Sequence, residues 1–161
     1  MRLSVTVEGI PRPKGSYNSV RGKHAIAASK HLKGWSQYVA IMADIEWRKQ
    51  GYKISERHTG PVLLTLLFAF PTPEKQTEAW PIGRADIDKI ERAVLDALTH
   101  VWYEDDAQVV AVAKFKVYEV GAGRVSIEMN RLRRNECPGA EWAAGLLAKF
   151  VESVGEPSDG G

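Results

Sequence analysis

DKIERAVLDALT, residues 88–99, carries an apolar side chain at every third or fourth position and therefore predicts an amphipathic helix of about a dozen residues. The segment before it, PVLLTLLFAF at 61–70, is apolar almost throughout, as expected of a strand in the middle of a sheet. In the segment after it, 109–117, apolar residues at every second position share one face, and Lys114 and Lys116 lie on the other face. This alternation is typical of another strand. A strand, a helix and a strand in this order predict helices packed on a sheet.

Weaker periodic signals extend this pattern in both directions. A first strand is predicted near the start of the chain, where apolar residues alternate with polar ones (Leu3, Val5, Val7). Apolar residues at helical spacing predict a helix over about 29–50, with Trp35 on its core-facing side. We expect the turn VGAGR at 120–124 to return the chain as a hairpin into a strand at 125–129.

The predicted order is β-α-β-α-β-β with a last helix, which makes the fold class α+β: a single domain in which helices pack on one mixed β-sheet. The proline-rich segment 71–83, PTPEKQTEAWPIG, is expected to be a surface loop. We expect a domain over 1–134, a C-terminal extension at 135–154 whose helix covers about 141–151, and a disordered tail at 155–161. Apolar residues recur along that helix and pack either on the core of the same chain, which we favour, or on a partner (Trp142, Leu146, Phe150).

Composition narrows the class of protein. With 161 residues, 44% of them hydrophobic, the chain is long enough for one core. The single cysteine, Cys137, cannot form an internal disulfide, and the start MRLSVTVEGI lacks the apolar stretch of a signal peptide. The longest apolar run is about half of what a membrane helix requires. We therefore expect a cytoplasmic protein that has no membrane partner.

Acidic residues gather on both sides of the helix at 88–99. Asp86 and Asp88 are two positions apart, so in an extended segment both carboxylates face the same way and suit a hard cation such as Mg²⁺. Glu104, Asp105 and Asp106 follow the helix, and on an extended strand Glu104 and Asp106 share one side. Two alternatives stay open: Asp88 as a helix N-cap with Glu91 in a capping box, and the second group as a solvated turn.

Basic residues gather elsewhere. The 35 residues from Gly9 to Ala43 contain no acid, and they carry the cations that we expect to bind DNA phosphates. The candidate DNA-binding residues are Arg12, Lys14, Arg21, Lys23 and Lys30. Cations later in the chain extend this surface if they lie on the same side (Lys114, Lys116, Arg131, Arg133, Arg134). The alternative is a solvated loop that contacts nothing.

The stretch RADIDKIERAVLDALTHVWYEDDAQVV, residues 84–110, resembles the signature of RusA-type Holliday junction resolvases. In that signature a D-x-D-N-x-x-K-A-x-x-D-A-L helix precedes a D-D-x-Q-V strand, and the similarity extends over about residues 3–131. The resemblance implies a metal-dependent endodeoxyribonuclease in which Asp86, Asp88 and Asp106 are catalytic and bind Mg²⁺, with Mn²⁺ as a substitute and Asp105 as a fourth candidate. It implies a RusA-like endonuclease domain over 1–134.

Two positions depart from that signature. Lys89 stands at the asparagine position, and Arg92 stands at the position of the catalytic lysine. Arg92 keeps a positive charge that stabilises a phosphate, but an arginine does not exchange protons, so an acid or base role passes to Lys89 if it exists. Asp96 is four residues from Arg92 and is expected to be its ion-pair partner rather than a metal ligand.

Three functions follow from these residues. The first is a Mg²⁺-dependent endonuclease that resolves Holliday junctions, with branched, four-way DNA as its partner. The second is a nuclease for another branched DNA, and the third is a junction-binding protein whose catalysis is impaired because of Arg92. A junction must be cut on two strands, so a domain with one site predicts a homodimer.

Overall fold

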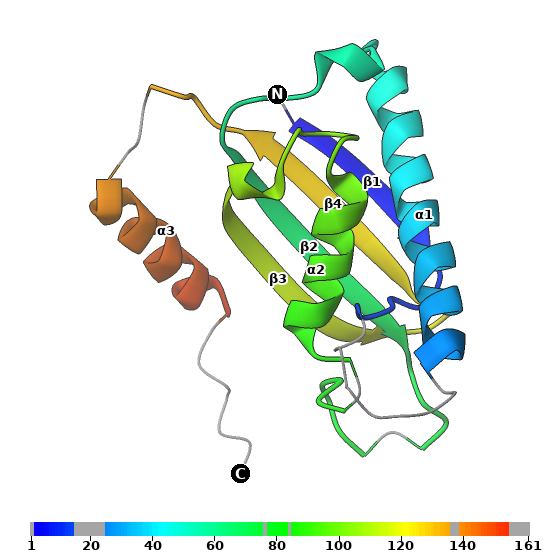
Figure 1. Cartoon of the computed structure of the whole chain (residues 1–161). Coiled ribbons are helices and arrows are strands. Elements are labelled where there is room, and N and C mark those ends of the chain that lie inside the picture. The colour runs from blue at the N-terminus through cyan, green and yellow to red at the C-terminus, as the bar shows by residue number, and fades with distance from the viewer. Residues whose placement is uncertain (1, 15–24, 76, 84, 136–138, 155–161) are drawn as a thin grey trace.

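The computed structural model describes residues 2–14, 25–75, 77–83, 85–135 and 139–154 (Figure 1). The strands are β1 (Arg2–Glu8), β2 (Val62–Pro71), β3 (Val109–Glu119) and β4 (Arg124–Arg131). The helices are α1 (Ala25–Lys49), α2 (Ile87–Leu98) and α3 (Gly139–Val154), with short 3₁₀ turns η1 (Ile54–Glu56) and η2 (Asp106–Gln108). The predicted order of elements and the α+β class with one mixed sheet are confirmed.

The strand order is β1-β4-β2-β3, so the predicted hairpin between β3 and β4 is wrong. β2 lies between them and pairs with β3 in parallel and with β4 antiparallel. The connection at 120–123 crosses the end of β2, and Gly123 adopts a left-handed φ of 81° there. A Cβ at Gly123 would lie 3.0 Å from the carbonyl oxygen of Ala69, so this close crossing requires a glycine.

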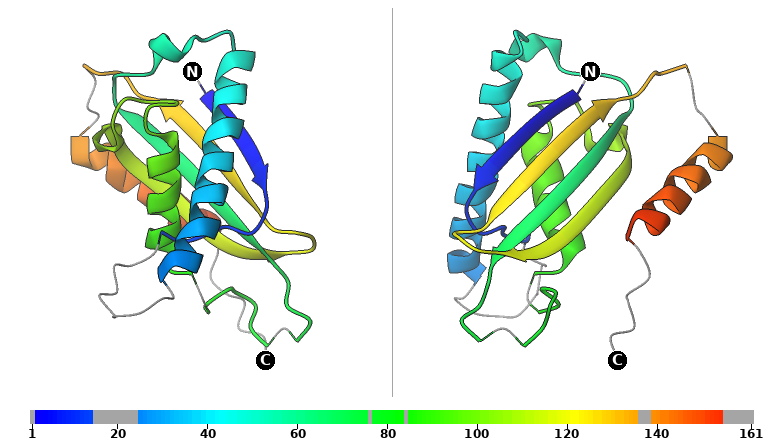
Figure 2. Two further views of the ribbon diagram at one scale, coloured as in Figure 1. Left: turned by 45° about the vertical axis from the view of Figure 1, so that its right-hand side comes forward. Right: turned by 180° about the vertical axis from the view of Figure 1, so that it is seen from behind.

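Helices α1 and α2 cover the same face of the sheet (Figures 1 and 2). Alternate residues of β2 and β4 point into this layer and are fully buried, among them Leu64, Phe68 and Met129. Trp35 is 7% exposed, which confirms its predicted place in the core. Trp102 fixes the end of α2 against α1 because its buried indole N–H donates to the carbonyl of Ala43 over 2.8 Å.

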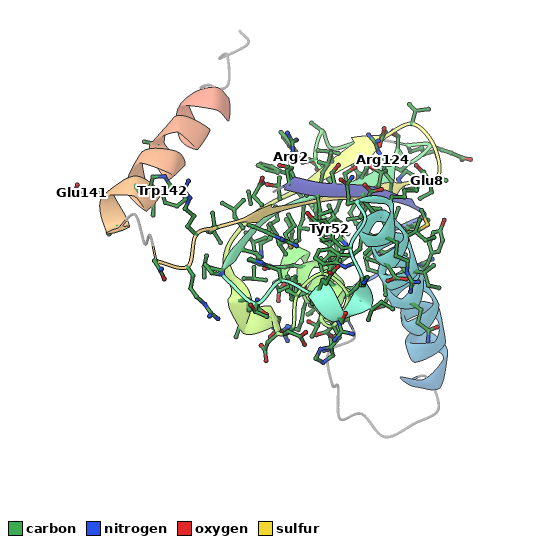
Figure 3. All side chains as sticks on the ribbon, turned by 90° about the horizontal axis from the view of Figure 1, so that it is seen from above. Arg2, Glu8, Tyr52, Arg124, Glu141 and Trp142 are labelled. Carbon is green, nitrogen blue, oxygen red and sulfur yellow. The ribbon has the colours of Figure 1, made fainter. Side chains whose placement is uncertain are left out.

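Helix α3 lies apart from this two-layer body (Figures 1 and 3). Its described side chains are exposed, and Trp142 is 41% exposed. The side chains of Leu146 and Phe150 lie outside the described part, so the packing of this apolar stripe stays a prediction. The predicted disordered tail at 155–161 lies outside the described residues. Of the helices in the described part, none has the length and apolar character needed to span a membrane.

Candidate active site

Asp86 and Asp88 lie at the N-terminal end of α2, both exposed. The Nζ of Lys89 donates to a carboxylate oxygen of Asp86 over 2.5 Å, and this hydrogen bond lowers the pKa of Asp86 and raises the pKa of Lys89. Ala85, just before them, adopts a left-handed φ of 73°, which costs a residue with a Cβ roughly 1–2 kcal/mol. Its carbonyl accepts from the Nζ of Lys116 on β3 over 3.2 Å, and this contact helps to hold the strained turn.

The capping interpretation of Asp88 is wrong. Asp86 is the residue that precedes the helix, and its side chain makes no capping hydrogen bond. Asp88 lies in the first helical turn, and its carboxylate accepts no hydrogen bond from a described residue. Glu91, the other half of the expected capping box, instead forms an ion pair with Lys114 of β3. The carboxylate of Asp88 is therefore available to a ligand as far as the described residues are concerned.

Cations lie along α2. The backbone N–H of Lys14 donates to the carbonyl of Lys89 over 3.0 Å, which fixes the segment after β1 against α2. The Nζ of Lys14 pairs with Asp96, so the predicted pair between Arg92 and Asp96 is wrong. Arg92 is exposed and has no ion-pair partner among the described residues. As far as the described residues are concerned, its guanidinium is therefore available to an anionic ligand.

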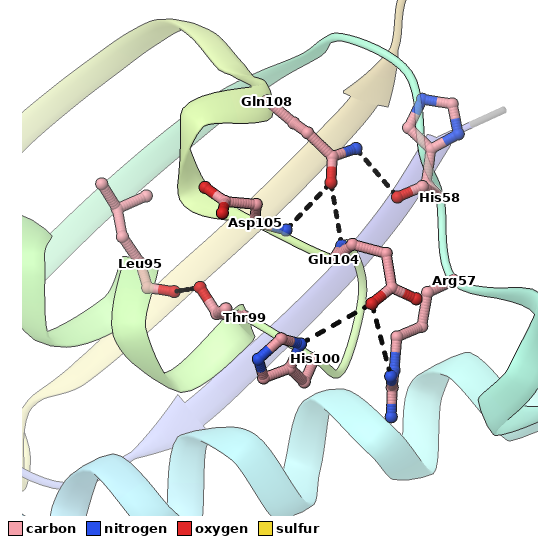
Figure 4. Close-up of polar contacts among 8 residues, drawn as sticks. All are labelled: Arg57, His58, Leu95, Thr99, His100, Glu104, Asp105 and Gln108. Atoms are coloured by element: carbon pink, nitrogen blue, oxygen red, sulfur yellow. Dashed lines mark hydrogen bonds and ion pairs between the residues drawn. The ribbon is translucent and has the colours of Figure 1, made fainter.

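The second acid group is not extended as predicted, because η2 forms at Asp106 (Figure 4). Asp105 caps this turn by accepting from the backbone N–H of Ala107 over 2.8 Å. Glu104 lies 3.6 Å from the guanidinium of Arg57 and 3.7 Å from Nδ1 of His100. Asp106 is exposed and has no such partner in the described part of the chain, so it is the member of this group that remains open to a ligand.

Gln108 holds the acid-bearing turn in place (Figure 4). Its side-chain oxygen accepts from the backbone N–H groups of Glu104 and Asp105, each over 2.9 Å. Its NH₂ group donates to the carbonyls of His58 and Gly60 over 2.9 and 2.8 Å. This one side chain therefore satisfies four backbone groups and fixes Asp106 relative to the start of β3.

The two acid groups lie at opposite ends of α2. The pKa of Tyr103 is raised by burial and, to a smaller extent, by the charge of Asp106. The hydroxyl of Tyr103 donates to the carbonyl of Leu95, so Asp106 lies toward the C-terminal end of α2. Asp86 lies at the other end, and a helix of 12 residues is about 18 Å long. Within the described residues of one chain, no three acidic, histidine or cysteine side chains gather as a metal site would require. The assignment of Asp86, Asp88 and Asp106 as metal ligands stays a prediction.

The candidate DNA-binding residues are only partly visible. Arg12 and Lys14 are exposed in the segment after β1. The backbone of Lys14 contacts Lys89 near the N-terminal end of α2, while its Nζ pairs with Asp96. Arg21 and Lys23 lie outside the described residues, and Lys30 falls within α1 but its side chain is outside the described part. Arg131 does not extend the DNA surface, because its guanidinium lies 5.2 and 5.1 Å from the ring centres of Trp47 and Tyr52.

Sequence reasoning missed one feature of this site. The loop at 71–83 places Trp80 and Ile82 beside the acid pair, where they line an open pocket with Ile87 and Lys116. Trp80 is 61% exposed and Ile82 is 71% exposed. A tryptophan inside a polar, proline-rich segment was the signal that could have identified it, because a residue of this size is usually well buried.

Exposed carboxylates that stand among lysines and arginines are compatible with a protein that acts on phosphodiesters, since cations bind the phosphate and carboxylates suit a metal. The family model of Endodeoxyribonuclease RusA matches residues 7–130. The chain belongs to the RusA endodeoxyribonuclease family, and the predicted resemblance is confirmed. The chain is also similar to the Uncharacterized protein YqaN of Bacillus subtilis (strain 168), with 29% identity over 132 residues that cover 72% of this chain and 87% of YqaN. Helix α3 lies beyond the matched residues.

Proposed function

We propose that this chain is a Mg²⁺-dependent, structure-selective endonuclease that resolves Holliday junctions by phosphodiester hydrolysis, with Mn²⁺ as a substitute metal. Membership of the RusA family carries this proposal. It is supported by Asp86, Asp88 and Asp106, which match the family acids in order and are all exposed. Carboxylate oxygens are the ligands that Mg²⁺ takes from proteins, usually one or two at a time.

The separation of the acids supports a homodimer. One copy does not bring Asp106 to Asp86 and Asp88, because α2 lies between them. A complete set of three therefore requires a second copy that places its own Asp106 beside the N-terminal end of α2 in the first. Two such sites, related by a two-fold axis, are what symmetric cleavage of a four-way junction needs.

Strand β3 offers a surface for that dimer. It is an edge strand of 11 residues, and Val110 on it is 60% exposed. Edge strands present unpaired N–H and C=O groups that a second strand can pair with. Asp106 lies at the start of β3, and Lys116 near its end contacts the turn before Asp86. Antiparallel pairing of β3 with its copy would set the start of one strand beside the end of the other. It would thereby bring Asp106 of one copy toward Asp86 of the other.

Two cations have different expected roles. Arg92 has no partner in the described part of the chain, so it stabilises the charge of the attacked phosphate without exchanging a proton. Lys89 is hydrogen-bonded to Asp86, and this contact raises the pKa of Lys89. A proton-transferring role for Lys89 stays a prediction.

The test is cleavage of a synthetic four-way junction, a replication fork and a simple duplex, each with and without Mg²⁺. The proposal expects paired cuts in the junction that require the metal, and little cutting of the duplex. Cleavage of the fork in preference to the junction would assign another branched substrate. Tight junction binding without cleavage in Mg²⁺ or Mn²⁺ would mean that the chain binds junctions but does not resolve them.

A further inference from the structure

We propose that the pocket beside Trp80 binds an unstacked nucleobase from the branch point of the DNA whose phosphates meet the N-terminal end of α2. This inference rests on the proposed function and deepens it, because it names how the site distinguishes branched DNA from duplex. The occupant is one nucleotide with its base out of the helical stack.

The pocket is an open hollow of about 430 Å³ on the side of the sheet where α2 begins. Its apolar lining residues include Trp80, Ile82, Ile87 and Phe115. Pro81 is buried between the two exposed side chains, and the backbone N–H of Ile82 donates to the carbonyl of Trp80 over 2.8 Å. The short turn is thus anchored by its middle residue while Trp80 and Ile82 stay exposed.

The pocket adjoins the acid pair. Ile87 stands between Asp86 and Asp88 in the sequence and lines the pocket. Lys116 also lines it, and its Nζ donates to the carbonyl of Ala85, one residue before Asp86. A DNA phosphate that meets the cation of Lys116 at this end of α2 therefore has the aromatic and aliphatic lining of the pocket beside it, where the base of the adjoining nucleotide can bind.

The charges favour a nucleotide over an apolar ligand. Lys116 forms no ion pair among the described residues, so its positive charge remains available to a phosphate oxygen. Trp80 supplies a flat ring on which any base can stack, and such stacking does not depend on sequence. A base in intact duplex is already stacked and paired and would first have to be extruded, which costs free energy. A branch point offers bases for which this cost is lowest.

The experiment measures binding in EDTA, so that it does not depend on cleavage. Affinities are compared for a four-way junction and for a duplex of the same sequence, with the wild type, Trp80→Ala and Trp80→Phe. We expect Trp80→Ala to weaken junction binding about tenfold, in the range for loss of one base–aromatic stack, while duplex binding stays within about twofold. Trp80→Phe keeps an aromatic ring and should retain most of the junction affinity. Trp142→Ala is the matched control, because it removes another exposed tryptophan, on helix α3 apart from the two-layer body (Figure 1), and should change neither affinity.

A second arm identifies the base. An abasic nucleotide is placed at each branch-point position in turn. At one position it should weaken junction binding by the wild type about tenfold. At that same position it should not weaken junction binding by Trp80→Ala any further. Independent, additive losses would overturn the proposal, as would equal losses of junction and duplex affinity or no loss from Trp80→Ala. A wild type that binds junction no better than duplex would refute the proposed function itself, and the inference with it, before any variant is considered.

Discussion

Mixing two inactive variants should restore part of the nuclease activity if each site is built from two copies. Asp86→Asn and Asp106→Asn are each expected to abolish cleavage in a homodimer, because every site then lacks one carboxylate. Neither change should disturb folding, because both carboxylates are exposed and the capping bond of η2 comes from Asp105. Among the described residues, the only ion pair lost is the exposed one between Asp86 and Lys89. Two such proteins can therefore be co-expressed and allowed to assemble.

The recovered activity follows from the arrangement of the acids. In a dimer of one Asp86→Asn chain and one Asp106→Asn chain, one site collects both substitutions and the other collects none. Random assembly from equal amounts makes about half of the dimers mixed, so about a quarter of all sites should be intact, by the two-fold symmetry of such an assembly. If each site instead took all its acids from one chain, every site would carry one substitution and no activity would return.

The assay separates nicking from resolution. Single-turnover nicking of a labelled four-way junction at saturating Mg²⁺ should reach about a quarter of the wild-type amplitude, whereas paired cuts should be almost absent because a mixed dimer has one working site. The matched control mixes Asp86→Asn with Asp88→Asn, two residues on the same end of α2, which should restore nothing. Recovery in this control, or none in the first mixture although mass spectrometry shows mixed dimers, would refute the two-copy site.

Three further predictions concern single residues. Arg92→Ala should lower single-turnover junction cleavage about 10²-fold without changing Tm, and Arg92→Lys should preserve cleavage; a near-normal rate for Arg92→Ala would remove Arg92 from the site. Trp102→Phe deletes the buried bond to Ala43 and leaves a cavity, so urea unfolding should show a loss of about 1–3 kcal/mol with an unchanged m value. Burial lowers the pKa of His58 below 6.5, so the folded state binds fewer protons than the unfolded state. The free energy of unfolding should therefore fall as pH drops through 6.5, and His58→Gln should flatten the dependence of Tm on pH between 7.5 and 5.5.

The elements could be predicted from periodicity, but the neighbours of each strand could not. The alternation in β3 and β4 is the same whether they pair with each other or with β2. Their connection at 120–123 is short enough to suggest a hairpin, yet four residues also span the roughly 10 Å between strands separated by one other. The continuous apolar run of β2 was the better signal, because a strand buried on its helix face and paired on both sides belongs in the middle.

The candidate site was predictable as a set of residues but not as a set of partners. A charge run such as Glu104–Asp106 does not indicate which acid caps a turn, and the structure assigns that role to Asp105. Spacing of four suggested a pair between Arg92 and Asp96, but Lys14 arrives from 82 positions away and takes that carboxylate. Helical spacing likewise predicted α3 without indicating what covers it.

The spacing between the two acid groups carries more information than their presence. A helix that connects two parallel strands runs antiparallel to both. The residue before the helix therefore lies near the C-terminal ends of these strands, and the residue after it lies near their N-terminal ends. Asp86 and Asp106 occupy those two places around α2, since β2 and β3 are parallel neighbours. Acids about twenty residues apart on such a unit are therefore kept apart by the topology, and no change of side-chain rotamer brings them together. A two-fold axis perpendicular to the strands, as in antiparallel pairing of β3 with its copy, reverses one copy relative to the other and sets opposite strand ends side by side. The proposed site, built from these three acids, therefore calls for two copies.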